Sequence, residues 1–380
     1  MFQSFSEAFL DELRSIKNST YKLLLLSFLP LFSFALIVSI FYKGVVHDLP
    51  IVVVDNDKSK LSRELLKNID ASSTIQIKYK LNSTKEAISL IQATKAYGVV
   101  IIPAHFQKNA LNKIQPKVTA MLNTQYILVG KILTSALTQA VMYSAAEVEF
   151  VEGLVKNNIP QSSINSANPI QLQVRSYFNT YQNYFLFLVS ALLPAIWQIF
   201  IVVATLVSFG SMFKAKEENL FFSDKYIFTK IVAKLLPYTL SYTLLGMLYL
   251  FYIYGTLGWT FEGSFSITIF AMFLTVVAYQ GIALLFFVSG FDYARSLSLG
   301  AVYTAPAFAF LGVTFPIYSM NGFALFWRDM LPISHYIELQ ISQANYGADV
   351  FLEIDKLLYI FAFWIVFLPV YLMFKKRLAL

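Results

Sequence analysis

The sequence predicts a polytopic α-helical membrane protein, with six transmembrane helices and an α/β extracytoplasmic domain inserted between helices 1 and 2. Of its 380 residues, 57% are hydrophobic and 13% are charged, whereas a soluble domain is about 25% charged. Six apolar runs are long enough to cross a bilayer as helices, which takes about 20 residues each. Between the first two runs, short β-branched segments alternate with segments of helical periodicity.

The composition excludes several kinds of site. The chain contains no cysteine, so disulfides, thiolate nucleophiles and cysteine-ligated metals are absent. Its three histidines, His47, His105 and His335, are too far apart in sequence to form a zinc motif. The net charge of +7 does not indicate a nucleic-acid partner, because a large share of the Lys and Arg lies in loops and a tail where membrane insertion places them.

Residues 1–20 predict an amphipathic helix at the membrane surface. Apolar residues recur at steps of three and four, and the acidic residues fall elsewhere on the helical turn. The apolar positions are Phe2, Phe5, Phe9, Leu13 and Ile16, and the acidic ones are Glu7, Asp11 and Glu12. Basic residues follow this helix rather than precede it, so we expect no cleavable signal peptide. Two interpretations of this helix stay open. It only anchors the first span at the membrane surface, or it also contacts a partner protein.

The six predicted spans return the chain to the side on which it began. The first covers residues 21–42, where Pro30 is tolerated as a kink. The others run over residues 184–209, 231–254, 265–288, 297–318 and 357–374. Together with their loops, spans two to six occupy residues 180–380. No ionised side chain lies at the centre of any span, so the spans hold no proton relay or fixed-charge ion site.

The segment 43–179 predicts one folded domain outside the membrane. Strands are expected at 51–55, 74–80, 97–103 and 117–122, and helices at 59–69, 83–92, 105–114 and 126–156. Ser59 is the expected N-cap of the first of these helices. The polar segment Asn157–Pro169 is interpreted as the linker back to the membrane.

The distribution of Lys and Arg orients the chain. The loop 210–234 carries Lys214, Lys216, Lys225, Lys230 and Lys234, and short loops rich in Lys and Arg stay in the cytoplasm. Counted in and beside the short segments, twelve Lys and Arg lie on the predicted cytoplasmic side and two on the opposite side. This distribution places both termini in the cytoplasm. The fifteen Lys and Arg of residues 43–179 do not contradict this, because long domains escape the charge rule.

The outer loop 319–356 combines apolar runs with helix-breaking prolines. Residues 323–327 and 330–333 are apolar, but neither run is long enough to span. Short re-entrant helices fit this pattern if protein covers their free backbone groups. An ordinary surface loop with aromatic anchors is the alternative.

No motif indicates catalysis. No stretch matches the phosphate-binding loop G-x-x-x-x-G-K-[ST]. Asp55-Asn56-Asp57 fails as a calcium loop, because Lys60 and Leu66 stand where Gly and Glu are needed. As the D-x-D of a sugar-nucleotide transferase the match is weak, and a turn before a helix capped by Ser59 is favoured. The spans instead contain aromatic and amide side chains. These suit a mainly apolar, partly polar transport substrate, or they serve only in helix packing. These candidates for a substrate path are Trp197, Gln198, Tyr279, Gln280, Tyr303, Phe308 and Phe310.

Several stretches together resemble one family. They are LPIVVVDNDKSKLSREL at 49–65, YGVVIIPAHF at 97–106, KLLPY at 234–238, FLGVTFPIYSM at 310–320 and LPISHY at 331–336. With the six-span layout and the insertion, the chain resembles the transmembrane permeases of type-2 ABC exporters, especially bacterial multidrug-efflux permeases with a large extracytoplasmic insertion. The resemblance covers nearly the whole chain.

The resemblance implies a permease subunit in the bacterial inner membrane that dimerises with a second permease, identical or dissimilar. It exports an amphiphilic substrate such as a drug or lipid, and a separate ABC ATPase subunit binds the ATP and Mg. This chain would hold no cofactor and would not be an enzyme. Many relatives also work with a membrane-fusion protein and an outer-membrane channel, for which the outer domain is a candidate docking surface.

In that family the amino-terminal helix and the loop after the second span contact the ATPase. Carried across by position, the coupling residues are Phe5, Phe9, Leu13, Lys214, Lys216, Glu217, Glu218 and Lys230. The sequence Glu217-Glu218-Asn219-Leu220 replaces the acidic-Gly-Thr pattern that is usual in this loop. The alternative function is a membrane-anchored sensor or assembly protein with a ligand-binding outer domain, and a glycosyltransferase using Asp55 and Asp57 is a more distant third.

Overall fold

The computed structural model describes residues 2–42, 44–112, 114–155, 183–214 and 226–378. Two compact units make up the chain. The α/β unit comprises Val45–Arg175, and the membrane unit comprises Met1–Gly44 with Ser176–Leu380.

The α/β unit is built on a four-stranded mixed sheet in the order β2-β1-β3-β4. The strands are β1 (Leu49–Asp55), β2 (Ile75–Leu81), β3 (Gly98–Ile102) and β4 (Thr119–Leu122). Strand β1 pairs in parallel with β2 and β3, and β4 pairs antiparallel with β3. The central strand β1 is buried on both faces, which is why residues 51–54 read as an unbroken β-branched run.

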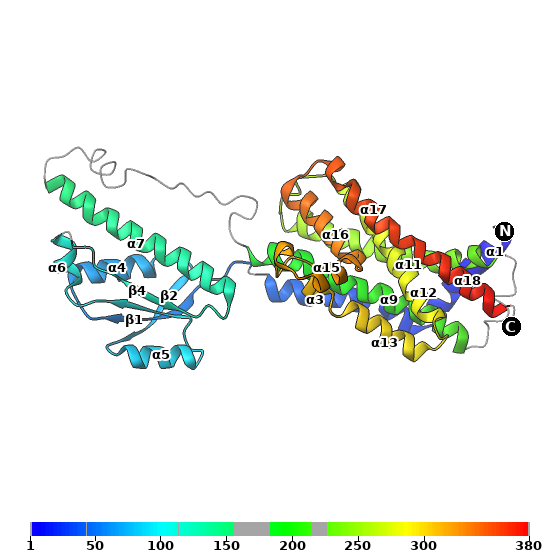
Figure 1. Cartoon of the computed structure of the whole chain (residues 1–380), viewed down its shortest axis with the longest axis horizontal. Coiled ribbons are helices and arrows are strands. Elements are labelled where there is room, and N and C mark those ends of the chain that lie inside the picture. The colour runs from blue at the N-terminus through cyan, green and yellow to red at the C-terminus, as the bar shows by residue number, and fades with distance from the viewer. Residues whose placement is uncertain (1, 43, 113, 156–182, 215–225, 379–380) are drawn as a thin grey trace. The chain divides into compact units, whose positions relative to one another are not determined.

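Helices cover both faces of this sheet. They are α4 (Lys60–Asp70), α5 (Thr84–Gln92), α6 (Phe106–Leu111) and α7 (Ile127–Val155). In Figure 1, α5 lies on one face and α4 with α7 on the other. Ser59 caps α4 as expected, because its side chain accepts a hydrogen bond from the backbone N–H of Ser62. The predicted linker Asn157–Pro169 lies outside the described residues.

Helix α7 is apolar enough to be mistaken for a membrane span. Its stretch Ile127–Glu147 is one of six described stretches that are long and apolar enough to cross a bilayer. However, Leu133, Leu137 and Ala140 are buried on one face. From α4, Asn68 Nδ2 donates hydrogen bonds to Ser144 Oγ and Glu147 Oε2, both 2.9 Å long. The helix therefore completes the core of the α/β unit.

The membrane unit is a helical bundle. Its other five candidate spans are Thr20–Phe41, Phe185–Phe213, Ile227–Thr256, Phe265–Val288 and Val350–Lys376. The main helices are α1 (Phe2–Lys17), α2 (Thr20–Leu26), α3 (Phe28–Phe41), α9 (Ser190–Lys214), α11 (Ile227–Leu250), α12 (Phe265–Val288), α17 (Ile354–Ala362) and α18 (Phe367–Leu378). Short helical turns extend them at Phe185–Val189, Phe251–Thr256 and Phe363–Val366. Within this unit, α1 and α18 reach the same end of the bundle (Figure 1).

The first span is interrupted, as Pro30 predicted. Helix α2 ends at Leu26 and α3 begins at Phe28, with Ser27 between them. A proline has no N–H to donate to the carbonyl four residues earlier and its ring crowds that carbonyl. The break therefore falls four residues upstream of Pro30, at the end of α2.

The predicted fifth span, residues 297–318, is wrong as a continuous helix. The structure has α13 (Tyr293–Thr304) and the short α14 (Ala307–Phe310), separated at Ala305 and Pro306. Pro306 interrupts the helical hydrogen bonds, and Gly312 then adopts a positive φ of 80°, which glycine tolerates without strain. A hydropathy profile does not reveal either break, because the residues around both are apolar.

The loop 319–356 contains the short helices that its sequence suggested. They are α15 (Gly322–Asp329) and α16 (Pro332–Ile341). Helix α16 is almost wholly buried, with Ile333, Tyr336 and Ile337 inaccessible to solvent. Protein therefore covers its backbone, which is the condition for a non-spanning helix at membrane depth.

Candidate functional site

A buried carboxylate joins the amino-terminal helix to the membrane bundle. Glu12 on α1 is only 2% exposed. Ionised carboxylates are almost never buried to this degree unless they are paired. Its partners therefore identify what α1 is fastened to.

Four side chains from three other helices donate hydrogen bonds to Glu12. Its Oε1 accepts from Lys22 Nζ on α2 (2.8 Å), from Ser208 Oγ on α9 (2.9 Å) and from Tyr238 OH on α11 (2.6 Å). Its Oε2 accepts from Lys234 Nζ on α11. Lys234 and Tyr238 are four residues apart, so both project from the same face of α11. We call these five residues the Glu12 cluster.

The electrostatics of the cluster keep Glu12 ionised. Burial alone would raise the pKa of this carboxyl, but the ammonium groups of Lys234 and Lys22 outweigh burial and hold the pKa below its ordinary value of 4.5. Lys22 Nζ also donates to Ser15 Oγ (2.8 Å), and Lys234 Nζ lies 5.7 Å from the centre of the Phe209 ring. Both cations are thus held within the protein rather than in water.

The buried face of α1 differs from the face that its apolar periodicity predicted. Glu12 was assigned to the polar side, yet Glu12 and Ile16 are buried, whereas Phe2 is 86% and Leu13 is 39% exposed. The bundle offers two lysines and a tyrosine at this point, so a carboxylate fits there better than a leucine would. Its partners lie 10 to 226 residues away in the sequence, so no local pattern could have revealed it.

Two further hydrogen bonds join the same helices one turn along α11 from the cluster. One helical turn beyond Tyr238, Tyr242 OH donates to the carbonyl of Leu25 (3.0 Å) at the end of α2. Trp197 Nε1 on α9 donates to the carbonyl of Tyr242 (3.0 Å). These contacts tie α2, α9 and α11 together beside the break in the first span.

The other predicted coupling residues are only partly within the described structure. Phe5 and Phe9 are half-buried on α1, and their rings stack 6.3 Å apart. Lys230 is half-buried on α11. Lys216, Glu217, Glu218 and the side chain of Lys214 lie outside the described residues. Their role as ATPase contacts stays a prediction.

The predicted path residues are mostly engaged in packing. Gln198 Nε2 donates to the carbonyl of Thr304 (3.3 Å), and Gln280 Oε1 accepts from Thr239 Oγ1 (2.8 Å). Tyr279 OH accepts from the backbone N–H of Ile333 (3.3 Å). Tyr303 OH donates to the carbonyl of Met330, while Phe308 and Phe310 are half-buried. None of these six residues lines the pocket described next.

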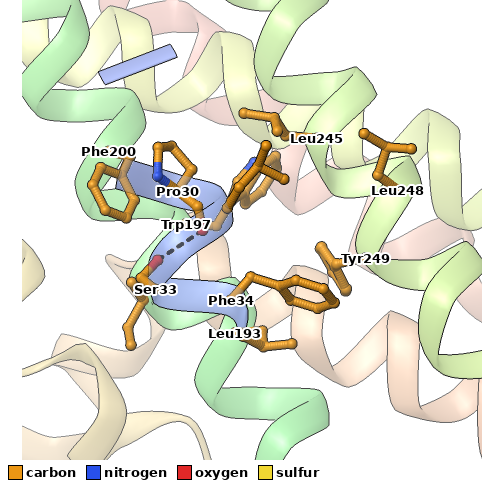
Figure 2. Close-up of a pocket in the computed structure, with 11 residues that line it drawn as sticks. Pro30, Ser33, Phe34, Leu193, Trp197, Phe200, Leu245, Leu248 and Tyr249 are labelled. Carbon is orange, nitrogen blue, oxygen red and sulfur yellow. Dashed lines mark hydrogen bonds between the residues drawn. The ribbon is translucent and has the colours of Figure 1, made fainter. Parts of the chain in front are cut away.

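An apolar pocket lies between α3, α9 and α11 (Figure 2). It is lined by Pro30, Leu31, Ser33, Phe34, Leu193, Ile196, Trp197, Phe200, Leu245, Leu248 and Tyr249. Trp197 is the residue that the pocket shares with the predicted path. Trp197 also donates to the carbonyl of Tyr242, so this wall of the pocket is bonded to α11.

In the α/β unit, Asp55 and Asp57 shape a turn. Asp55 Oδ1 accepts from the backbone N–H groups of Asp57 (3.0 Å) and Lys58 (2.9 Å), and Asp55 Oδ2 accepts from Ser62 Oγ (2.8 Å). Asp57 Oδ2 accepts from the backbone N–H of Gln107 (3.0 Å). The favoured interpretation as a turn is confirmed. Across the described residues, no group of three or more His, Asp or Glu side chains could hold a metal ion.

A comparison with protein families gives a match. The model of a family described as ABC-2 family transporter protein matches residues 22–373. Among curated proteins, none matches the chain.

Proposed function

Because the chain belongs to the ABC-2 transporter family, whose model covers residues 22–373, we propose that it is the permease subunit of an ATP-driven exporter of amphiphilic substrates. The family makes it the transmembrane component of an ABC transporter, a system in which an ATPase partner supplies the energy. We further propose that it acts in the inner membrane of a bacterium with a second permease, and that its termini are cytoplasmic.

The Glu12 cluster is the observation that carries the coupling part of this proposal. An ATPase bound below the membrane would reach the chain at α1 and at the loop 210–234. Glu12 fastens α1 to α2, α9 and α11 through two ammonium groups and two hydroxyl groups. A displacement of α1 is therefore passed to three helices at once.

The energetics suit such a connection. Separating one partner from a buried ion pair costs about 3 to 5 kcal/mol. Moving a two-state bundle from 1:99 to 99:1 takes about 5.5 kcal/mol of differential binding, which nucleotide binding at a partner ATPase supplies. The two energies are of the same order, and Glu12 is held by two ammonium groups and two hydroxyl groups at once, so we propose that the cluster moves together with α1.

The α/β unit is proposed to lie outside the cytoplasm, where a membrane-fusion protein can dock on it. The outer helices α15 and α16 would close the bundle on that side. Export toward this unit follows from the orientation that the lysines of residues 210–234 predict.

Co-purification tests the partner. We expect the tagged chain, extracted in mild detergent, to bring down an ABC ATPase, and we expect the chain alone not to hydrolyse ATP. In vesicles holding the complex, Glu12→Gln should lower amphiphile-stimulated hydrolysis about five-fold or more, the lower end for coupling between sites. The control Glu7→Gln changes an exposed carboxylate on the same helix and should behave as wild type. ATP hydrolysis by the purified chain alone would overturn the proposal.

A further inference from the structure

We infer that the pocket between α3, α9 and α11 binds one acyl chain of a bilayer lipid. The pocket is formed by three helices that belong to the candidate spans Thr20–Phe41, Phe185–Phe213 and Ile227–Thr256. The inference needs these spans to lie in a bilayer. It does not depend on ATP-driven export.

The walls of the pocket offer an occupant mainly hydrocarbon. Ser33 Oγ donates to the carbonyl of Pro30 (2.9 Å), as the dashed line in Figure 2 shows. Trp197 Nε1 donates to the carbonyl of Tyr242, and Tyr249 OH donates to Gln340 Oε1 (2.6 Å). The polar side chains of the lining are thus satisfied within the protein. A ligand carrying its own polar groups would bury them there without partners, at a cost of about 1 to 3 kcal/mol each.

The rim of the pocket is apolar as well. Leu31 on α3 and Leu248 on α11 are both more than two-fifths exposed. In a membrane protein such side chains meet lipid tails, because the bilayer core contains no water. A hydrocarbon chain can therefore enter from the side while its headgroup stays at the interface.

The break in the first span explains why a pocket exists here. Pro30 lines it, and it is the residue that ends the regular hydrogen bonding between α2 and α3. Figure 2 shows Phe34 from α3, Leu193 from α9 and Tyr249 from α11 around the same space. Gaps between packed helices forfeit dispersion energy, and a straight acyl chain restores those contacts.

Photo-crosslinking of the full chain tests the inference. The chain is placed in phosphatidylcholine vesicles that contain some phosphatidylcholine with a diazirine in one acyl chain, without ATP or an ATPase. We expect crosslinks to concentrate on lining residues such as Phe34, Leu193 and Leu248. A diazirine in the headgroup should leave these residues unlabelled. Labelling spread evenly over the exposed apolar residues of all spans would overturn the inference.

A matched pair of variants sharpens the result. Leu245→Trp fills the pocket, whereas Leu244→Trp places the same side chain at the neighbouring, exposed position of α11. Relative to wild type, Leu245→Trp should lower the labelling of Phe34 and Leu193 at least five-fold, and Leu244→Trp should not. Equal labelling in the two variants contradicts the inference. Should Leu245→Trp fail to fold, the wild-type crosslinking map decides alone.

Discussion

Glu12 is the residue through which α1 is bonded to three helices of the bundle. We predict that Glu12→Ala lowers the free energy of unfolding by about 3 to 5 kcal/mol, because it leaves the ammonium groups of Lys22 and Lys234 buried without their carboxylate. Thermal or chemical unfolding of the purified chain in detergent measures this. Glu7→Ala, at an exposed site where the side chain accepts a hydrogen bond from Gln3 Nε2, should stay within about 0.5 kcal/mol of wild type. Similar losses in both variants would show that the cluster does not stabilise the fold.

The pH dependence of stability follows from the same residue. The pKa of Glu12 is held below its ordinary value of 4.5, so its stabilisation is fully present above that value and is lost as the pH falls through the folded-state pKa. We predict that the stability gap between wild type and Glu12→Gln shrinks as the pH is lowered below 4.5. Unfolding curves of both proteins at each pH measure it. A gap that stays constant into acid would contradict the assignment.

For single residues, the sequence predicts contacts between neighbours in the chain better than contacts between residues far apart in it. The cap by Ser59 and the turn at Asp55 depend on residues a few positions away, so their spacing predicts them. The burial of Glu12 depends on Lys234 and Tyr238, which lie more than two hundred residues away. Amphipathic periodicity assigns every charged residue to the polar side, and therefore it assigned Glu12 there too.

Among the helices, α13 packs closely on α9. A Cβ at Gly300 would lie 2.9 Å from Val202 Cγ1 and 3.3 Å from Leu206 Cδ1. We predict that Gly300→Leu destabilises the chain by about 1 to 3 kcal/mol, the usual cost of overpacking. Ala301→Leu, one residue along and exposed, should change stability by less than about 0.5 kcal/mol. Thermal unfolding separates them, and an unaffected Gly300→Leu would show that α13 is not fixed against α9.

The predicted helices and strands agree with the structure where the segment has a uniform residue pattern. The strands β1 and β3 are short β-branched runs, and α12 is an unbroken apolar run whose predicted bounds, residues 265–288, are those of the structure. The fifth span differs because its apolar composition hides the breaks at Pro306 and Gly312. The mean hydropathy of a window is barely changed by one proline or glycine. The helix is nevertheless broken there, because proline cannot donate the backbone hydrogen bond that the helix needs.

For the whole molecule, the absence of cysteine makes the proposed orientation directly testable. We predict that Lys17→Cys and Lys376→Cys are protected from a membrane-impermeant maleimide in intact cells, and that Lys95→Cys in the α/β unit is labelled. All three positions are exposed in the structure. Opening the cells should make all three reactive. Labelling of Lys376→Cys from outside would reverse the topology and remove the basis for export.

The ion pair between Glu12 and Lys234 joins residues 222 positions apart, and the segment between them contains the entire α/β unit. The entropy of closing such a loop grows only with the logarithm of its length, about 0.6 kcal/mol for each doubling. Enlarging or exchanging the enclosed unit would thus barely weaken the closure, provided that the replacement folds by itself. We therefore expect the bundle to accept a different inserted domain while the ion pair between Glu12 and Lys234 is kept.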